Sequence, residues 1–110
     1  MEFIEDEEFT TEWFSLGLND DYMWAMQNEI ASNPRGSPVC PGMAGARKIR
    51  IPMAGRGKSG GARTIYYFMS ERNTIYLLWV YAKKNTEELP QVIKHLIGAT
   101  VRDIKRSQGS

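Results

Sequence analysis

The chain of 110 residues is long enough for one compact domain and too short for two. Its composition, 42% hydrophobic, 25% charged and 11% aromatic, is that of a folded globular protein and excludes a disordered or fibrous one. The net charge of +1 conceals an asymmetry, because residues 1–34 carry nine acids and no Lys or Arg, whereas residues 35–110 carry all 14 basic residues and four acids. The second part, at +10, is suited to an anionic partner, and the alternative is a solvated dipolar surface.

The single cysteine, Cys40, cannot form an intrachain disulfide and has no second thiol for a CxxC motif. The N-terminal residues are acidic, where a secretory signal would be basic and then apolar, and no apolar run is long enough to span a bilayer. We therefore expect a cytoplasmic protein in a reducing compartment.

The first residues predict a short strand and a helix. Residues 2–5 form the strand candidate. Apolar side chains then recur at helical spacing, which predicts a helix near 9–16 with Thr10 or Thr11 as its N-cap and Gly17 at its end.

A second helix is expected to follow directly. The run Asn19-Asp20-Asp21 supplies an N-cap and acids for the first turn of this helix. The helix should end near Asn33 and Pro34. Residues 34–45 are crowded with Pro and Gly and are predicted to be a surface loop. The apolar stripe of the helix consists of Tyr22, Met23, Met26 and Ile30.

From Ala46 the pattern changes to the alternation of a strand. Ile49 and Ile51 point to one face, while Lys48 and Arg50 point to the other. This pattern predicts a strand with a basic open face.

Two further strands are predicted at 62–69 and 74–82, which are rich in β-branched and aromatic residues, with a hairpin turn at 71–73. The strand at 74–82 is apolar on both faces, so we expect it to lie centrally or beneath helices.

An apolar stripe of period 3.6 predicts a C-terminal helix from about 86 to 106. Asn85 or Thr86 is the expected cap, and Pro90 is tolerated only in the first turn. Two N-terminal helices, an antiparallel β-meander with a short N-terminal strand and a C-terminal helix define a single α+β domain over 1–110.

The segment 47–63 carries six cations and no acid, which is typical of polyanion binding. Its glycines allow close approach of the backbone, and their N–H groups can cradle a phosphate. The alternative is a plain basic hairpin on an unrelated scaffold. The six cations are Arg47, Lys48, Arg50, Arg56, Lys58 and Arg63.

Three other kinds of site are not supported. Gly57-Lys58-Ser59 resembles the end of a nucleotide-binding P-loop, but Pro52 stands where that motif needs glycine, and a strand follows instead of a helix. The sole histidine, His95, has no triad partner and is expected to be an ordinary surface residue. No His/Cys/Asp cluster has ligand spacing, so we expect neither metal nor cofactor.

Catalysis would therefore use Lys, Arg and Tyr. RNA supplies its own 2′-hydroxyl nucleophile, so an enzyme need only orient it, remove its proton, neutralise the phosphate and protonate the leaving 5′-oxygen. A lysine crowded by cations is pushed toward its neutral form, and guanidiniums hold phosphate bidentately. Lys48 lies beside Arg50 and is expected to face Arg63. Tyr67 shares a face with Arg63 and can stack on a base, whereas most other aromatic residues are expected in the core.

Four stretches together resemble the HigB branch of the RelE/ParE toxin superfamily. They are the runs 45–51, 55–63, 65–68 and 76–84, and the order of the predicted elements extends the resemblance from about 42–90 to nearly the whole chain. The resemblance implies a microbial toxin that cleaves mRNA in the ribosomal A site. It also implies silencing by an antitoxin, usually a helix-turn-helix repressor.

The resemblance also assigns candidate site residues. Lys48 and Arg50 match the paired cations of the second strand in RelE-like enzymes, and Arg63 matches the phosphate-binding arginine of the third. Lys83 or Lys84 matches the basic residue after the fourth strand. The expected RNA-binding residues are Arg47, Arg56, Lys58 and Tyr67.

The general acid is left unassigned, because Leu89 and Pro90 stand nearest to the position where RelE has a C-terminal tyrosine. Two main functions stay open. The first is a ribosome-dependent endoribonuclease, and the second is a non-enzymatic inhibitor, since ParE members share the scaffold but act on DNA gyrase. A basic RNA-binding module is a further alternative. The basic strand cluster favours RNA. We expect an acidic or amphipathic antitoxin segment to cover the basic part or to hold its cations away from RNA, and the acidic part is a second surface that can face the antitoxin. The resemblance implies an alternative, because HigB-like toxins also bind antitoxin away from the active site.

Overall fold

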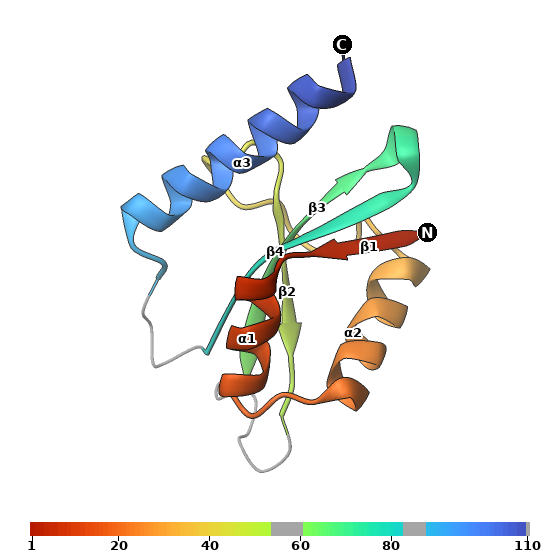
Figure 1. Cartoon of the computed structure of the whole chain (residues 1–110), viewed down its shortest axis with the longest axis vertical. Coiled ribbons are helices and arrows are strands. Elements are labelled where there is room, and N and C mark those ends of the chain that lie inside the picture. The colour runs from red at the N-terminus through yellow and green to blue at the C-terminus, as the bar shows by residue number, and fades with distance from the viewer. Residues whose placement is uncertain (54–60, 83–87, 110) are drawn as a thin grey trace.

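The computed structural model describes residues 1–53, 61–82 and 88–109 as an α+β fold. Figure 1 shows α3 on one side of the sheet and α1 and α2 on the other, which confirms the predicted fold class and element order. The strands are β1 (Glu2–Glu5), β2 (Arg47–Ile51), β3 (Ala62–Met69) and β4 (Thr74–Ala82). The helices are α1 (Glu7–Ser15), α2 (Asp20–Ser32) and α3 (Gln91–Gly109).

The four strands form one mixed sheet in the order β1-β4-β3-β2. Strands β2, β3 and β4 are the expected antiparallel meander, and β4 lies in the interior of the sheet as predicted. The first strand pairs with β4 in parallel, a pairing that the sequence did not indicate. At the predicted hairpin turn, a short 3-10 turn over Ser70–Arg72 ends at Asn73, which takes a left-handed conformation with φ 49°.

One irregularity in β4 decides which side chains share a face. Ile65 pairs with Trp79 and Tyr66 pairs with Leu77, so Leu78 is an extra residue with no partner in β3. Such a bulge shifts the alternation of a strand by one residue. As a result Leu78 and Trp79 both pack with the α3 side of the sheet, whereas Leu77 packs with the α1 and α2 side.

The larger core lies between the sheet and the two N-terminal helices. Trp13 and Ile30 are completely covered there, and the indole Nε1 of Trp13 donates a hydrogen bond to the carbonyl oxygen of Asn19 at 3.0 Å. Burial of a large apolar side chain contributes about 1.5–3 kcal/mol, so these residues hold both helices on the sheet.

The second core lies under α3 and corrects the prediction of a surface loop. Cys40 and Met43, from the segment predicted as a loop, are buried against Ile97 and Val101 of α3. The segment has no regular secondary structure, but the amide of Cys40 donates to the carbonyl oxygen of Ala46 at 2.8 Å and folds it back under the helix. Ile65 of β3 and the apolar side of α3 give these side chains something to pack against.

The first helix begins earlier than predicted. Its N-cap is Asp6, whose carboxylate accepts a hydrogen bond from the amide of Phe9 at 2.8 Å, so the expected caps Thr10 and Thr11 lie inside the helix. An aspartate satisfies the free amides of a first turn better than threonine does, and the acids at the start of α1 favour the same end. The second helix has its predicted cap, Asn19, and Gly17 ends the first helix with a positive φ of 86°.

The third helix begins at Gln91, about five residues later than predicted. Pro90 precedes it, and its carbonyl oxygen accepts hydrogen bonds from Ile93 and Lys94. The expected caps Asn85 and Thr86 lie outside the described residues. Proline lacks an N–H group and disfavours helical geometry in the residue before it, so a helix that starts after Pro90 avoids this conflict.

Gly61 is required where β3 begins beside β2. A Cβ atom at this position would collide with the carbonyl oxygen of Ile51, so only glycine allows the two backbones to approach this closely. Among the described helices, none combines the length and apolar character needed to cross a membrane.

Candidate functional site

The second strand presents two cations to solvent, as predicted. Lys48 and Arg50 are exposed, and the intervening Ile49 and Ile51 are buried in the larger core. The alternation of a strand therefore places both basic side chains on the face of the sheet that α3 also occupies.

Arg63 extends this group onto β3, where it pairs directly with Arg50. Arg63 is only 9% exposed, in contrast to the two exposed cations of β2, and its Nη1 donates to the carbonyl oxygen of Ala62 at 3.2 Å. Burial lowers the pKa of the guanidinium below its ordinary value, the charge of Arg50 lowers it further, and Tyr81 opposes both effects. Arginine stays charged despite such a shift, so the structure holds two like charges side by side.

Tyr81 completes the group and was not among the predicted site residues. It pairs with Arg63 on β4 and is half-buried on the same face. Burial raises the pKa of its phenol, Arg63 opposes this rise, and Cys40 and Glu88 add to it. A hairpin without the bulge would have placed Val80 opposite Arg63, so the sequence pattern alone did not reveal the pair. We call Lys48, Arg50, Arg63 and Tyr81 the basic face.

A cavity of about 490 Å³ adjoins the basic face. Lys48 and Tyr81 line it from the sheet, and Glu88 and Lys94 line it from the residues before and within the start of α3. Lys94 and Glu88 form an ion pair with Nζ and Oε2 3.3 Å apart. Lys94 thus adds a cation that the sequence analysis did not single out, because on sequence it is one charge among many on an amphipathic helix.

Cys40 forms part of the same cavity wall. Burial raises the pKa of its thiol, and the charges of Lys48 and Lys94 act in the opposite direction. The thiol therefore stays protonated at neutral pH and is a poor nucleophile.

Two predicted RNA contacts are engaged elsewhere. Arg47 lies on the opposite face of β2 from Lys48, and its Nη1 donates to the carbonyl oxygens of Arg35 and Ser37 at 3.0 and 2.7 Å. Tyr67 does share the α3 face with Arg63, but Lys105 of α3 lies 5.5 Å from the centre of its ring. The structure thus brings neither side chain into the basic face.

The remaining predictions concern four cations, the histidine and metal binding. Four of the predicted cations, Arg56, Lys58, Lys83 and Lys84, lie outside the described residues. His95 is exposed on α3, as expected for a surface residue. Within the ranges that the structure describes, no group of His, Cys, Asp and Glu could hold a metal ion.

Comparison with known proteins adds one finding about the fold. No protein-family model matches the sequence. A mutant of the Escherichia coli toxin RelE, solved in the free state, is structurally similar with a TM-score of 0.56 and 19% identity, over 92% of this chain and 95% of that one. The fold is RelE-like. The RelE-like sheet brings the basic face together on one surface, next to an open cavity, which is an arrangement suited to a phosphodiester backbone.

Proposed function

We propose that this chain is the toxin of a toxin–antitoxin system, a HigB-type endoribonuclease that cleaves mRNA on the ribosome. The observation that carries the proposal is the meeting of Lys48, Arg50, Arg63 and Tyr81 on one face of a RelE-like sheet. Two guanidiniums, one lysine amine and one protonated phenol are the groups needed to cleave RNA without metal or imidazole.

Each group on the basic face has a role in the proposed reaction. Arg50 and Arg63 hold the phosphate and stabilise the charge that develops on its oxygens. The 2′-oxygen attacks phosphorus as its proton passes to the Lys48 amine in its neutral form, and the bond from phosphorus to the 5′-oxygen breaks. Tyr81 donates its proton to that leaving oxygen, so the products are a 2′,3′-cyclic phosphate and a 5′-hydroxyl.

We assign Tyr81 as the general acid, the role that the sequence left open. A tyrosine phenol is protonated at neutral pH, which is the state that a proton donor requires, and the charge of Arg63 opposes the rise in its pKa that burial causes. Arg56 and Lys58 remain predicted contacts to RNA, and Lys83 and Lys84 remain predicted catalytic residues.

The proposal implies a partner and a location. A ribonuclease of this kind must be silenced in its own cell, and we propose an antitoxin that carries a helix-turn-helix DNA-binding domain. Ribosomes and mRNA are the other partners, which places the protein in the cytoplasm.

The test is primer extension on a reporter mRNA incubated with the purified chain, with and without translating ribosomes. We expect discrete cleavage sites that appear only with ribosomes, and loss of these sites in the double variant Lys48→Ala/Arg50→Ala. The variant His95→Ala, changed at an exposed position outside the basic face, should cleave like the wild type.

The same purified chain, tested as well in a supercoiling assay with gyrase, separates the alternative functions. A ParE-like inhibitor would leave the mRNA intact and block DNA supercoiling by gyrase, and a plain RNA-binding module would leave the mRNA intact and gyrase active. Either result overturns the proposal, and loss of cleavage in His95→Ala with an unchanged circular dichroism spectrum would overturn the assigned chemistry.

A further inference from the structure

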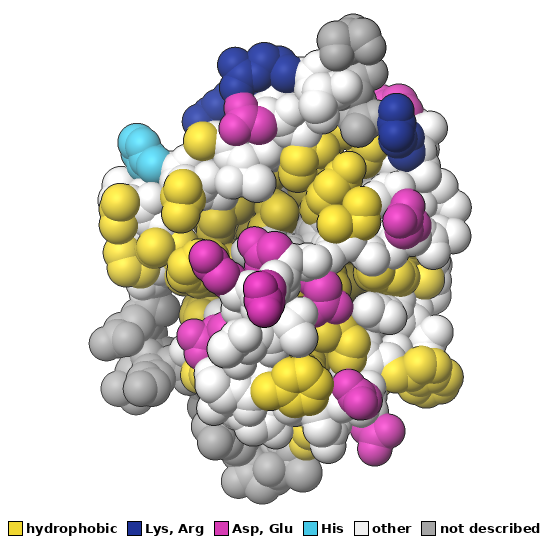
Figure 2. All heavy atoms as spheres, in the orientation of Figure 1, with side chains coloured by type: hydrophobic (Ala, Val, Ile, Leu, Met, Phe, Trp, Pro, Cys, Tyr) yellow, Lys and Arg dark blue, Asp and Glu magenta, His cyan; other side chains and the backbone are white. Residues whose placement is uncertain are grey.

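A second concave surface is lined by none of the four residues of the basic face. It is a groove of about 490 Å³ between α1 and α3, with residues of β4 as its floor. Figure 2 shows hydrophobic side chains gathered between these two helices, beside a group of acidic side chains over α1. We call it the α1–α3 groove.

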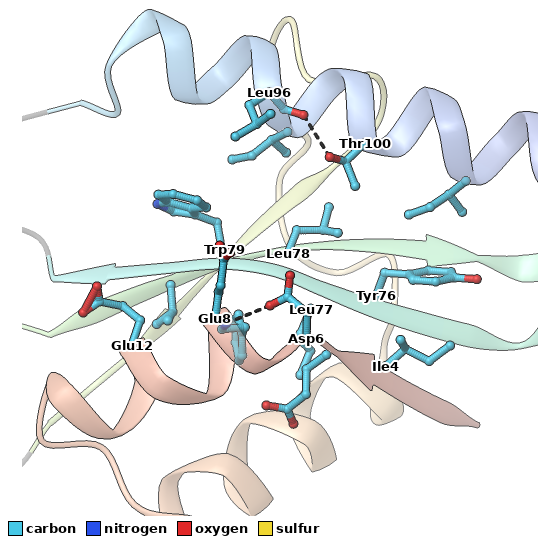
Figure 3. Close-up of a pocket in the computed structure, with 15 residues that line it drawn as sticks. Ile4, Asp6, Glu8, Glu12, Tyr76, Leu77, Leu78, Trp79, Leu96 and Thr100 are labelled. Atoms are coloured by element: carbon cyan, nitrogen blue, oxygen red, sulfur yellow. Dashed lines mark hydrogen bonds between the residues drawn. The ribbon is translucent and has the colours of Figure 1, made fainter.

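Its lining is unusually apolar for a surface that faces solvent. Leu96 of α3 is 55% exposed and Ile4 of β1 is 39% exposed, while Leu78 and Trp79 of the floor are only partly buried. Figure 3 shows Leu96 facing the floor from α3 and Ile4 at the other side of it. A contiguous exposed apolar surface of this kind is the usual mark of an interaction site.

The α1 wall of the groove is acidic. Glu5, Asp6, Glu8 and Glu12 line it, and the described lining residues include no Lys or Arg. Figure 3 places Glu8 and Glu12 on α1 beside the floor. An apolar floor with a one-sided acidic wall is complementary to a surface that is apolar in the middle and basic along one edge.

The spacing of the wall residues favours a helix as the occupant. Leu96, Thr100 and Ile104 follow one another at intervals of four along α3, and all three line the groove. Glu8 and Glu12 have the same interval on α1. Rows at this interval form ridges, and the ridges of one helix pack into the grooves between the ridges of another.

We propose that the α1–α3 groove binds an amphipathic helix of a partner protein, with its apolar stripe on Leu96 and Trp79 and its Lys or Arg side chains against Glu8 and Glu12. Under the proposed function this partner is the antitoxin, and the identification of the antitoxin rests on the proposed function. The antitoxin would then bind outside the basic face, as in the second of the two expected binding modes, and its binding helix would carry basic side chains against the acidic wall.

The test uses a synthetic probe helix as long as α3, with a leucine stripe flanked by lysines, and measures its binding to the full chain by fluorescence anisotropy. We expect saturable binding, an increase in helical circular dichroism on binding, and weaker binding at higher salt. In Leu96→Glu the dissociation constant should rise about tenfold or more. In Glu8→Lys/Glu12→Lys it should also rise about tenfold, because two exposed charge contacts are reversed.

The matched control is His95→Glu, which introduces the same charge on α3 at an exposed residue that does not line the groove and lies outside the row of Leu96, Thr100 and Ile104. Its affinity should equal that of the wild type. Equal weakening by His95→Glu and Leu96→Glu, tighter binding of a probe with glutamates in place of lysines, or no binding at all would overturn the proposal. If Glu8→Lys/Glu12→Lys lowers the melting temperature, Glu8→Gln/Glu12→Gln replaces it.

Failure here is distinct from failure of the proposed function. Probe binding needs no RNA or ribosome, so a chain that binds the probe but leaves mRNA intact keeps the groove and loses the toxin assignment. The reverse result, cleavage without probe binding, would support the toxin assignment and overturn the assignment of the α1–α3 groove as a binding site.

Discussion

The guanidinium of Arg63 is permanently charged, and the side chain is almost entirely buried. With only 9% of its surface exposed and Arg50 paired to it, its guanidinium is held in place by packing before any RNA arrives. A preorganised charge is worth more in a transition state than one that must be ordered when substrate binds.

Replacing Arg63 by alanine should reduce ribosome-dependent cleavage about a hundredfold or more, because one preorganised contact to the developing phosphate charge is lost. The measurement is the initial rate of cleavage at matched protein concentration. Arg72→Ala, at an exposed arginine in the hairpin turn, is the control and should keep full activity. An Arg63→Ala chain that folds and cleaves at the wild-type rate would remove Arg63 from the site.

Tyr81→Phe should lower the cleavage rate about a hundredfold while leaving RNA affinity within about twofold, since only the proton donor is removed. The ring keeps its packing, so the melting temperature should hold. A substrate whose 5′-oxygen is replaced by sulfur, a better leaving group, should restore most of the rate. If the phenylalanine variant stays slow on that substrate, Tyr81 is not the general acid.

The buried thiol of Cys40 makes stability depend on pH. Its pKa is raised in the folded chain, so the folded state holds the proton more tightly than the unfolded state does. This contribution is fully present below the unfolded thiol pKa of about 8.5 and is lost as pH rises through the folded value. Urea unfolding should show lower stability near pH 9.5 than near pH 7.5, with a smaller drop in Cys40→Ala. Equal drops in both chains would contradict this account.

At the scale of elements, the start of α1 depends on one carboxylate. Asp6→Ala should lower the free energy of unfolding by about 1 kcal/mol, because the amide of Phe9 loses its hydrogen-bond acceptor. Thr11→Ala, at an exposed position inside the helix, serves as the control and should change stability by less than about 0.5 kcal/mol. Urea titrations of the two variants decide between the observed cap and the one expected from sequence.

For the whole molecule, the separation of charge should control RNA binding. The logarithm of affinity for a single-stranded RNA falls with the logarithm of salt, with a slope of about −0.7 for each phosphate neutralised. Removing both exposed cations in Lys48→Ala/Arg50→Ala should therefore make the slope shallower by about 1.4. Anisotropy titrations of a labelled RNA over a series of salt concentrations test this. An unchanged slope would place the RNA elsewhere on the +10 part of the chain.

Local patterns were enough to predict most of the elements. The bounds of β3 and β4 agree with those expected. Their β-branched and aromatic residues predict strands, and the turn between β3 and β4 marks where one ends and the other begins. The exposed cations Lys48 and Arg50 followed from alternation within β2. These properties depend on neighbours in the chain, so the sequence by itself determined them.

The pairing of elements distant in the chain was decided only by the tertiary structure. The bulge at Leu78 places Tyr81 opposite Arg63, and α3 buries Cys40 in a segment that looked like a surface loop. Both outcomes depend on which backbone lies across the sheet and which helix covers it. A local sequence pattern does not predict such contacts, because the burial of a side chain depends on the partners that the whole fold brings to it.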